Sequence, residues 1–221
     1  MELSNLKKGV KTLYIAAILH VAVLLLTFIV SILAIFAGDD EENPLLVLVG
    51  LLGIAFLVAG ILVIIFDLVG SNKASKGEAL FKKAFLCMLF DLLFSIVAAF
   101  TNGMAQKILS LVAAVLEFGF GFFVVLGMIK LAKDRKQEEI AENGQKTKML
   151  YCIAYAVSLV GSAIYTFTEG TIASVFSTIS SLGMLVAFIF YFLFLKKSMN
   201  VVDIPLKQEE DTENPVEVEA E

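Results

Sequence analysis

Six long apolar segments alternate with short polar segments along this chain. Each apolar segment is roughly 17 to 26 residues long, and a helix needs about 20 residues to cross the hydrocarbon core of a bilayer. If these segments form helices, each helix is apolar on nearly every face. This is typical of membrane spans rather than of surface helices in soluble domains. The pattern predicts an all-α polytopic membrane protein with six transmembrane helices. The six segments are residues 12–37, 45–70, 84–100, 108–129, 149–167 and 172–195.

The composition agrees with this prediction. Hydrophobic residues make up 59% of the 221 residues and charged residues 18%, and the mean hydropathy is +0.89. A soluble domain of this length would carry far more charge. No basic patch is interleaved with aromatic residues, so we expect the lipid bilayer as a partner and no binding of nucleic acid.

The basic residues predict the orientation of the chain. Of the 17 Lys and Arg residues, all but Lys107 lie in the segments 1–11, 71–83, 130–148 and 196–221. Basic residues near the ends of membrane helices concentrate on the cytoplasmic side. We therefore expect a multi-pass protein of the plasma membrane with both termini cytoplasmic. The excess of lysine over arginine is associated with AT-rich bacterial genomes, which favours a bacterial source.

This orientation divides the chain into three helical hairpins. They comprise residues 12–70, 84–129 and 149–195, and we expect them to be parallel because each enters and leaves on the cytoplasmic face. The three hairpins begin with similar residues. Two explanations remain open: internal duplication of one hairpin, or the sequence requirements that any membrane hairpin shares. Cytoplasmic segments at 1–11, 71–83 and 130–148 precede the hairpins. The acidic segment 196–221 is predicted to be a disordered cytoplasmic tail.

Four ionisable residues fall within the apolar segments. His20, Asp91 and Glu117 are predicted at similar depths on three different helices, each among small residues. A charge at the bilayer centre costs roughly 2.5–3.5 kcal/mol on insertion scales, so such residues normally face the bundle interior or a cavity. The three are a candidate proton or cation site, or else a buried hydrogen-bonded cluster that locks the bundle. Asp67 lies closer to a helix end, and we expect it at the cytoplasmic lip.

Small residues recur at helical spacing and predict packing seams between helices. Gly53 and Gly60 mark such a stripe in the second segment, and Ser158 and Ser162 mark one in the fifth. The two cysteines are expected to be free thiols. With a single histidine and no Cys-x-x-Cys, the sequence predicts neither a metal site nor a cofactor.

No motif identifies a biochemical activity. Paired catalytic groups would have to come from very few polar residues, so we expect no enzymatic function. We favour a non-enzymatic accessory or scaffold protein that packs against another membrane protein or a second copy of itself. The alternative is a small proton- or cation-linked transporter or channel that uses His20, Asp91 and Glu117. A hydrated cavity that reaches Asp91 or Glu117 would favour transport, and a dry, fully packed seam would favour the scaffold.

Overall fold

The computed structural model describes residues 2–37, 44–168 and 170–204. These residues form six α-helices and one short 3-10 helix, which confirms the all-helical prediction. The acidic residues 39–42 and the acidic segment 205–221 lie outside the described residues. The elements are α1 (Glu2–Ala37), α2 (Pro44–Ala74), α3 (Ala79–Ala99), α4 (Gly103–Asp134), α5 (Glu138–Phe167), α6 (Gly170–Ser198) and η1 (Met199–Asp203).

Five of the six helices are long and apolar enough to span a membrane, namely α1, α2, α4, α5 and α6. The architecture is therefore that of a helical, apolar integral membrane protein. The third helix, α3, differs because every stretch of 18 residues in it contains Lys82, Lys83 and Asp91. Its 21 residues still give a length of about 31 Å at 1.5 Å per residue.

The helices extend beyond the apolar segments that predicted them. The first apolar segment starts at residue 12, but α1 starts at Glu2, and α5 starts at Glu138 rather than at residue 149. Hydropathy detects only the part of a helix in hydrocarbon, whereas Glu, Lys and Gln continue the helix into polar surroundings because they are good helix formers. Between α4 and α5 only residues 135–137 remain non-helical. Lys136 there adopts a left-handed conformation at φ 57°, and the Gln137 N–H donates to the Ala132 carbonyl at 2.8 Å, as in a Schellman helix end.

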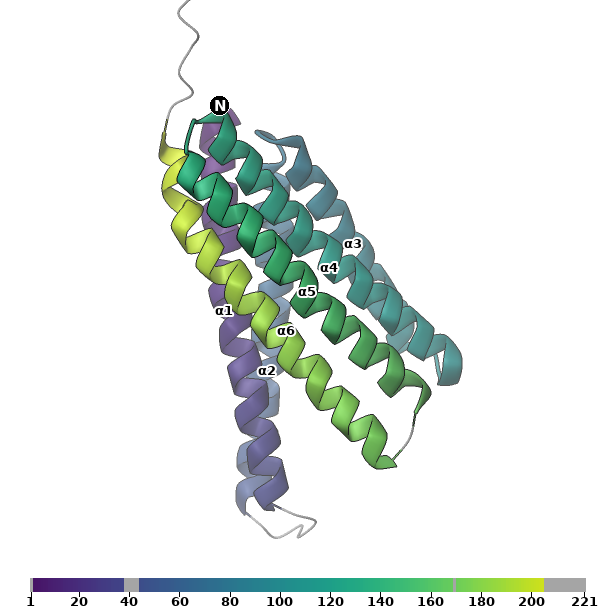
Figure 1. Cartoon of the computed structure of the whole chain (residues 1–221). Helices are drawn as coiled ribbons and strands as arrows, with labels where there is room; N and C mark the ends of the chain where they lie inside the picture. Colours follow the sequence, from purple (N-terminus) through teal and green to yellow (C-terminus); the bar gives the residue numbers. More distant parts are fainter. Residues whose placement is uncertain (1, 38–43, 169, 205–221) are drawn as a thin grey trace, which may run out of the picture.

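The six helices form a closed ring in chain order (Figure 1). The most extensive packing is within the pairs α1–α2, α3–α4 and α5–α6. The pairs are joined by α4 against α5, α2 against α3, and α1 against α6. Away from the N-terminal end, α1 and α2 diverge from the other four helices (Figure 1).

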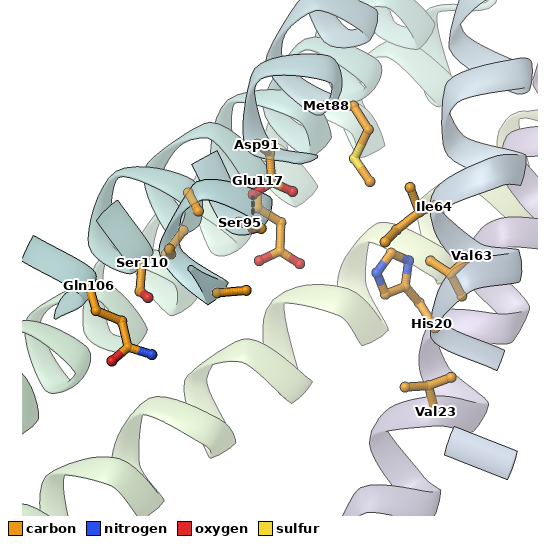
Figure 2. Close-up of a pocket in the computed structure, with 15 residues that line it drawn as sticks. His20, Val23, Val63, Ile64, Met88, Asp91, Ser95, Gln106, Ser110 and Glu117 are labelled. Carbon is orange, nitrogen blue, oxygen red and sulfur yellow. Dashed lines mark hydrogen bonds between the residues drawn. The ribbon is translucent and has the colours of Figure 1, made fainter. Parts of the chain in front are cut away.

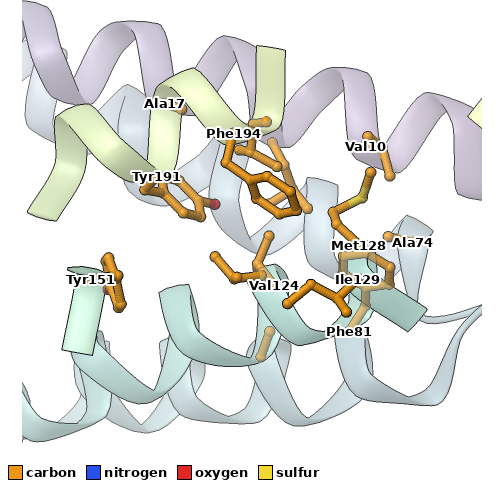
Figure 3. Close-up of a cluster of buried hydrophobic side chains, with 14 of the residues drawn as sticks. Val10, Ala17, Ala74, Phe81, Val124, Met128, Ile129, Tyr151, Tyr191 and Phe194 are labelled. Atoms are coloured by element: carbon orange, nitrogen blue, oxygen red, sulfur yellow. The ribbon is translucent and has the colours of Figure 1, made fainter. Parts of the chain in front are cut away.

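The core is concentrated at one end of this ring. That end contains the beginnings of α1, α3 and α5 and the ends of α2, α4 and α6, together with most of the lysines, and is named here the lysine-rich end. Figure 3 shows part of its core, with Val10, Phe81, Met128 and Phe194 converging from four helices. Each of these side chains is at most 4% exposed. Large apolar residues remain exposed on the outer faces of all six helices, where lipid would solvate them.

Polar contacts reinforce the lysine-rich end. Lys7 forms an ion pair with Asp203, and the Arg135 Nε donates to the Ile204 carbonyl at 2.9 Å. The structure therefore differs from the prediction that disorder begins at residue 196. Residues 196–204 are helical or docked, because Val201 and Val202 are apolar and bury themselves against the bundle.

Two glycines allow α1 and α2 to approach closely at this end. A Cβ added to Gly9 would overlap the backbone of Ala74, and one added to Gly70 would lie 2.9 Å from the Leu13 side chain. The predicted seam at Gly53 and Gly60 is not where α2 packs, since a Cβ at either would meet nothing within 4 Å. Close packing of α1 on α2 thus depends on glycines outside the predicted stripe.

Replacing Gly9 by alanine should destabilise the protein, because the added methyl group has no space. Overpacking of this kind costs about 1–3 kcal/mol. The matched control is Gly53→Ala, which has room for the methyl group and should change stability by at most about 1 kcal/mol, in the favourable direction. Reversible unfolding in mixed detergent micelles measures both. Equal effects of the two substitutions would contradict the close approach at Gly9.

Candidate functional site

A cavity of about 560 Å³ lies between the α1–α2 pair and the α3–α4 pair (Figure 2). It extends from the middle of α4 to the last turn of α3 and the first turn of α4, away from the lysine-rich end. Its lining is small and polar along α3 and α4 and more apolar along α1 and α2. The lining residues are His20, Val23, Gly60, Val63, Ile64, Met88, Asp91, Ser95, Ala98, Ala99, Gln106, Ser110, Ala113, Ala114 and Glu117.

The structure brings His20, Asp91 and Glu117 to this one cavity. His20 comes from α1, Asp91 from α3 and Glu117 from α4. Figure 2 shows the imidazole on one wall and the two carboxyl groups on the other. The helical positions explain this placement, because each residue lies on the face of its helix that turns inward where the two helix pairs diverge.

Each carboxyl group has one hydrogen-bond donor nearby. The Tyr155 hydroxyl of α5 donates to the Glu117 Oε2 at 3.0 Å, and the Ser95 hydroxyl, one turn along α3, lies 3.4 Å from the Asp91 Oδ1. Tyr155 is fully buried, so its bond orients Glu117 from behind the cavity wall. The remaining carboxyl oxygens have no hydrogen bond from the described side chains and are available to an exchangeable proton or a cation.

Asp67 is placed differently from the lip position predicted for it. Its side chain is 1% exposed, and its Oδ2 lies 3.6 Å from the His20 Nδ1. The reason is the register of α2: Asp67 precedes Gly70 by three residues and so shares the face that packs against α1. His20 also stacks on the Phe188 ring at a centroid distance of 4.4 Å. His20 therefore connects the cavity to a buried carboxyl group.

Buried tyrosines form a second polar feature that the sequence analysis did not identify. Tyr151, Tyr155 and Tyr191 are each at most 1% exposed, and the Tyr151 ring lies 5.5 Å from Tyr155 and 6.2 Å from Tyr191. The Tyr151 and Tyr191 hydroxyls have no hydrogen-bond partner among the described residues. Tyrosine in membrane helices is most frequent at the interfaces, and Tyr151 and Tyr191 lie close to Lys148 and Lys196, so the sequence carried no signal that they are buried together.

The side chains favour proton chemistry over metal binding. Among the described residues no group of three or more His, Cys, Asp and Glu could hold a metal ion. Two carboxyl groups and an imidazole on facing walls can accept and release protons, or attract a small cation through oxygen atoms. None of the described lining residues is Lys or Arg, so the cavity offers no fixed positive charge to an anion.

Comparison with known protein-family models, with curated proteins and with solved structures gave no match to this chain.

A double-mutant cycle tests the contact between His20 and Asp67. His20→Asn and Asp67→Asn should each destabilise the protein, because each disrupts the approach of the imidazole to the buried Asp67 Oδ2, which has no hydrogen bond from the described residues. The double variant should lose less than the sum of the two, with a coupling free energy of about 0.5–3 kcal/mol. Unfolding in mixed micelles provides the four free energies. Additive losses would show that the two side chains do not interact.

Proposed function

We propose that this protein is a small transporter that moves protons, or a small cation coupled to them, through the cavity between the α1–α2 and α3–α4 pairs. The observation that carries the proposal is the convergence of His20, Asp91 and Glu117 on one cavity of about 560 Å³. A packed seam would have favoured a purely structural role for these residues. A cavity in contact with both carboxyl groups provides the access that an exchangeable proton requires.

The energetics of the membrane interior support this assignment. A carboxyl group placed within a span destabilises insertion by a few kcal/mol, and such residues commonly mark ion and proton pathways. Asp91 and Glu117 are both placed in this way, and no lysine or arginine lines the cavity to neutralise them. Protonation or a bound cation neutralises the carboxylates instead, which couples their charge to the transported species.

The unequal packing of the two ends supports an alternating-access mechanism. The core closes the lysine-rich end, whereas the cavity reaches the opposite ends of α3 and α4. In this mechanism we assign the described arrangement to the state with access from the end opposite the lysines. Transport then requires the α1–α2 pair to rock against α3–α4, closing the cavity at its mouth and loosening the packing at the lysine-rich end.

We further propose that all six helices cross the membrane with the lysine-rich end in the cytoplasm. The described chain starts and finishes at the same end, as the Lys7–Asp203 ion pair requires. An even number of crossings, such as six, returns a chain to the side on which it starts. Lys107, the one lysine predicted on the opposite side of the membrane, also has a structural role. The Lys107 ammonium donates to the Thr166 carbonyl at 2.8 Å, so it neutralises the negative end of the α5 dipole.

Cysteine labelling tests this topology in intact cells. With Cys87 and Cys152 replaced by alanine, an Asn102→Cys variant should react with a membrane-impermeant maleimide added outside. A Lys76→Cys variant should react only after the membrane is permeabilised. Both positions are exposed, so accessibility reports the side of the membrane. Labelling of Lys76→Cys in intact cells would overturn the proposed orientation.

Proton flux tests the transport function. Purified protein in liposomes with a trapped pH-sensitive dye should acidify or alkalinise the lumen when a potassium gradient and valinomycin impose a voltage. Asp91→Asn and Glu117→Gln should reduce this flux at least about tenfold, because each amide preserves the shape and no longer exchanges a proton. A parallel measurement with a sodium gradient distinguishes proton movement alone from coupled movement of a cation.

The control for these variants is Glu142→Gln, which removes an exposed carboxyl group at the lysine-rich end. It should leave flux unchanged, and all variants should elute as the wild type does in size-exclusion chromatography. Wild-type protein that supports neither proton- nor sodium-linked flux would contradict the transporter proposal.

One observation favours the accessory or scaffold class as the second candidate. Gly50 and Gly53 lie on α2, and a Cβ at each would meet nothing within 4 Å. Small residues on an open helix face allow another helix to approach closely. An accessory role predicts a stable complex with another membrane protein or a second copy of this chain, and it predicts no flux.

A further inference from the structure

A second cavity, of about 630 Å³, lies between α5 and α6 at the lysine-rich end. Three lysines line it: Lys146 on α5, and Lys196 and Lys197 in the last turn of α6. Its other walls are the apolar side chains of Leu150, Phe190, Leu193 and Phe194 and the polar ones of Asn143 and Thr147. The cavity thus combines positive charge with an apolar surface, and it is named here the groove.

The charged and apolar parts of this groove are arranged along the bundle axis. Lys196 and Lys197 are in the final turn of α6, whereas Leu193 and Phe190 lie one and two turns further from that end. Leu193 is 48% exposed and Leu150 is 37% exposed, and both are accessible from the outer face of the bundle. Phe194, at 2% exposed, forms the floor of the groove.

The three lysines have no acidic partner among the described residues. The ion pairs of that part of the chain use Lys7, Lys130 and His20 instead, and no Asp or Glu lines the groove. Three ammonium groups in one groove repel one another unless an anion neutralises them.

We propose that this groove is a binding site for the anionic headgroup and upper acyl chain of a phospholipid of the cytoplasmic leaflet. The lysines contact the phosphate oxygens, with Asn143 and Thr147 as additional hydrogen-bond donors. The acyl chain lies along Leu150, Leu193 and Phe190. Basic pockets between membrane helices on the cytoplasmic side bind anionic headgroups in this way. This proposal uses the orientation proposed above and is independent of transport.

The apolar walls distinguish a lipid from the other anions available to the lysines. A free phosphate ion uses only the charged rim and leaves Leu150 and Leu193 without a partner. The acidic segment 205–221 follows Ile204 in the chain, but it holds more acidic residues than apolar ones and no aromatic residue. Only a lipid supplies a negative group and a long apolar chain in the order that the groove presents.

Native mass spectrometry of the full chain in detergent tests the site with phosphatidylglycerol and phosphatidylcholine as probes. The wild type should bind phosphatidylglycerol at least tenfold more tightly than phosphatidylcholine. Each lysine near an anionic lipid contributes roughly fivefold to affinity, so K196Q/K197Q should weaken binding by about 30-fold. The matched control is K82Q/K83Q, which removes two adjacent exposed lysines of α3 at the same end and should change affinity less than twofold. Circular dichroism checks that both double variants remain folded.

Several outcomes would overturn the proposal. Equal losses in the two double variants would mean that the lysines attract lipid through general surface charge. Displacement of phosphatidylglycerol by millimolar inorganic phosphate would reduce the site to a phosphate site without lipid specificity. A tenfold gain in lipid affinity on deletion of residues 205–221 would identify the chain's own acidic segment as the occupant. Leu193→Asn should weaken phosphatidylglycerol binding while leaving the charge intact, and an unchanged affinity would exclude the acyl-chain contact.

Discussion

Close packing of all six helices at the lysine-rich end is the constraint on which the rest of the structure depends. Gly9 and Gly70 let α1 and α2 approach until backbone meets backbone, and Val10, Phe81 and Met128 fill the centre of the same end. Because lipid solvates apolar side chains well, close van der Waals packing must hold these helices together rather than the exclusion of water. Such packing is available only where small residues and large ones alternate across the ring. Further along the bundle α1 and α2 diverge from the other helices (Figure 1). There α5 and α6 stay in close contact, since a Cβ added to Gly161 would lie 2.9 Å from the Phe176 carbonyl oxygen.

The candidate site lies at the boundary between the packed and the open parts of the bundle. Asp67 and Tyr151 are buried on the packed side, while Asp91 and Glu117 line the cavity. His20 belongs to both regions, since it lines the cavity and lies 3.6 Å from Asp67. Burying a polar group without a hydrogen-bond partner costs free energy, so any motion that changes the packing at this boundary also changes the energetics of these groups. Packing and the charge of the site are thereby linked through one histidine.

The sequence predicted the helices and the similar depth of His20, Asp91 and Glu117, because hydropathy and depth along a helix both depend only on position in the chain. It also predicted the seam at Ser158 and Ser162, whose hydroxyls both lie within hydrogen-bond distance of Ser180 on α6. It did not predict the packing face of α2. Asp67 was placed at the lip from its distance to the helix end, although its separation of three residues from Gly70 puts it on the buried face. Gly53 and Gly60 were taken as a packing seam from their spacing, whereas space around a glycine depends on the crossing point of two helices. These features depend on contacts between residues far apart in the chain, which spacing alone does not encode.

The third helix shows how an unfavourable residue can be accommodated by its neighbours. Every stretch of 18 residues in α3 contains Lys82, Lys83 and Asp91, and a central aspartate alone disfavours insertion by about 2.5–3.5 kcal/mol. The neighbouring α4 packs extensively on α3, and its Lys130 ammonium lies 2.8 Å from the Glu78 carboxylate. The same Glu78 accepts a hydrogen bond from the Leu80 N–H at the start of α3. The helix is therefore fixed to α4 at the lysine-rich end, while its polar residue lines the cavity. Asp91 thus lies where α3 borders the cavity, together with Glu117 of α4.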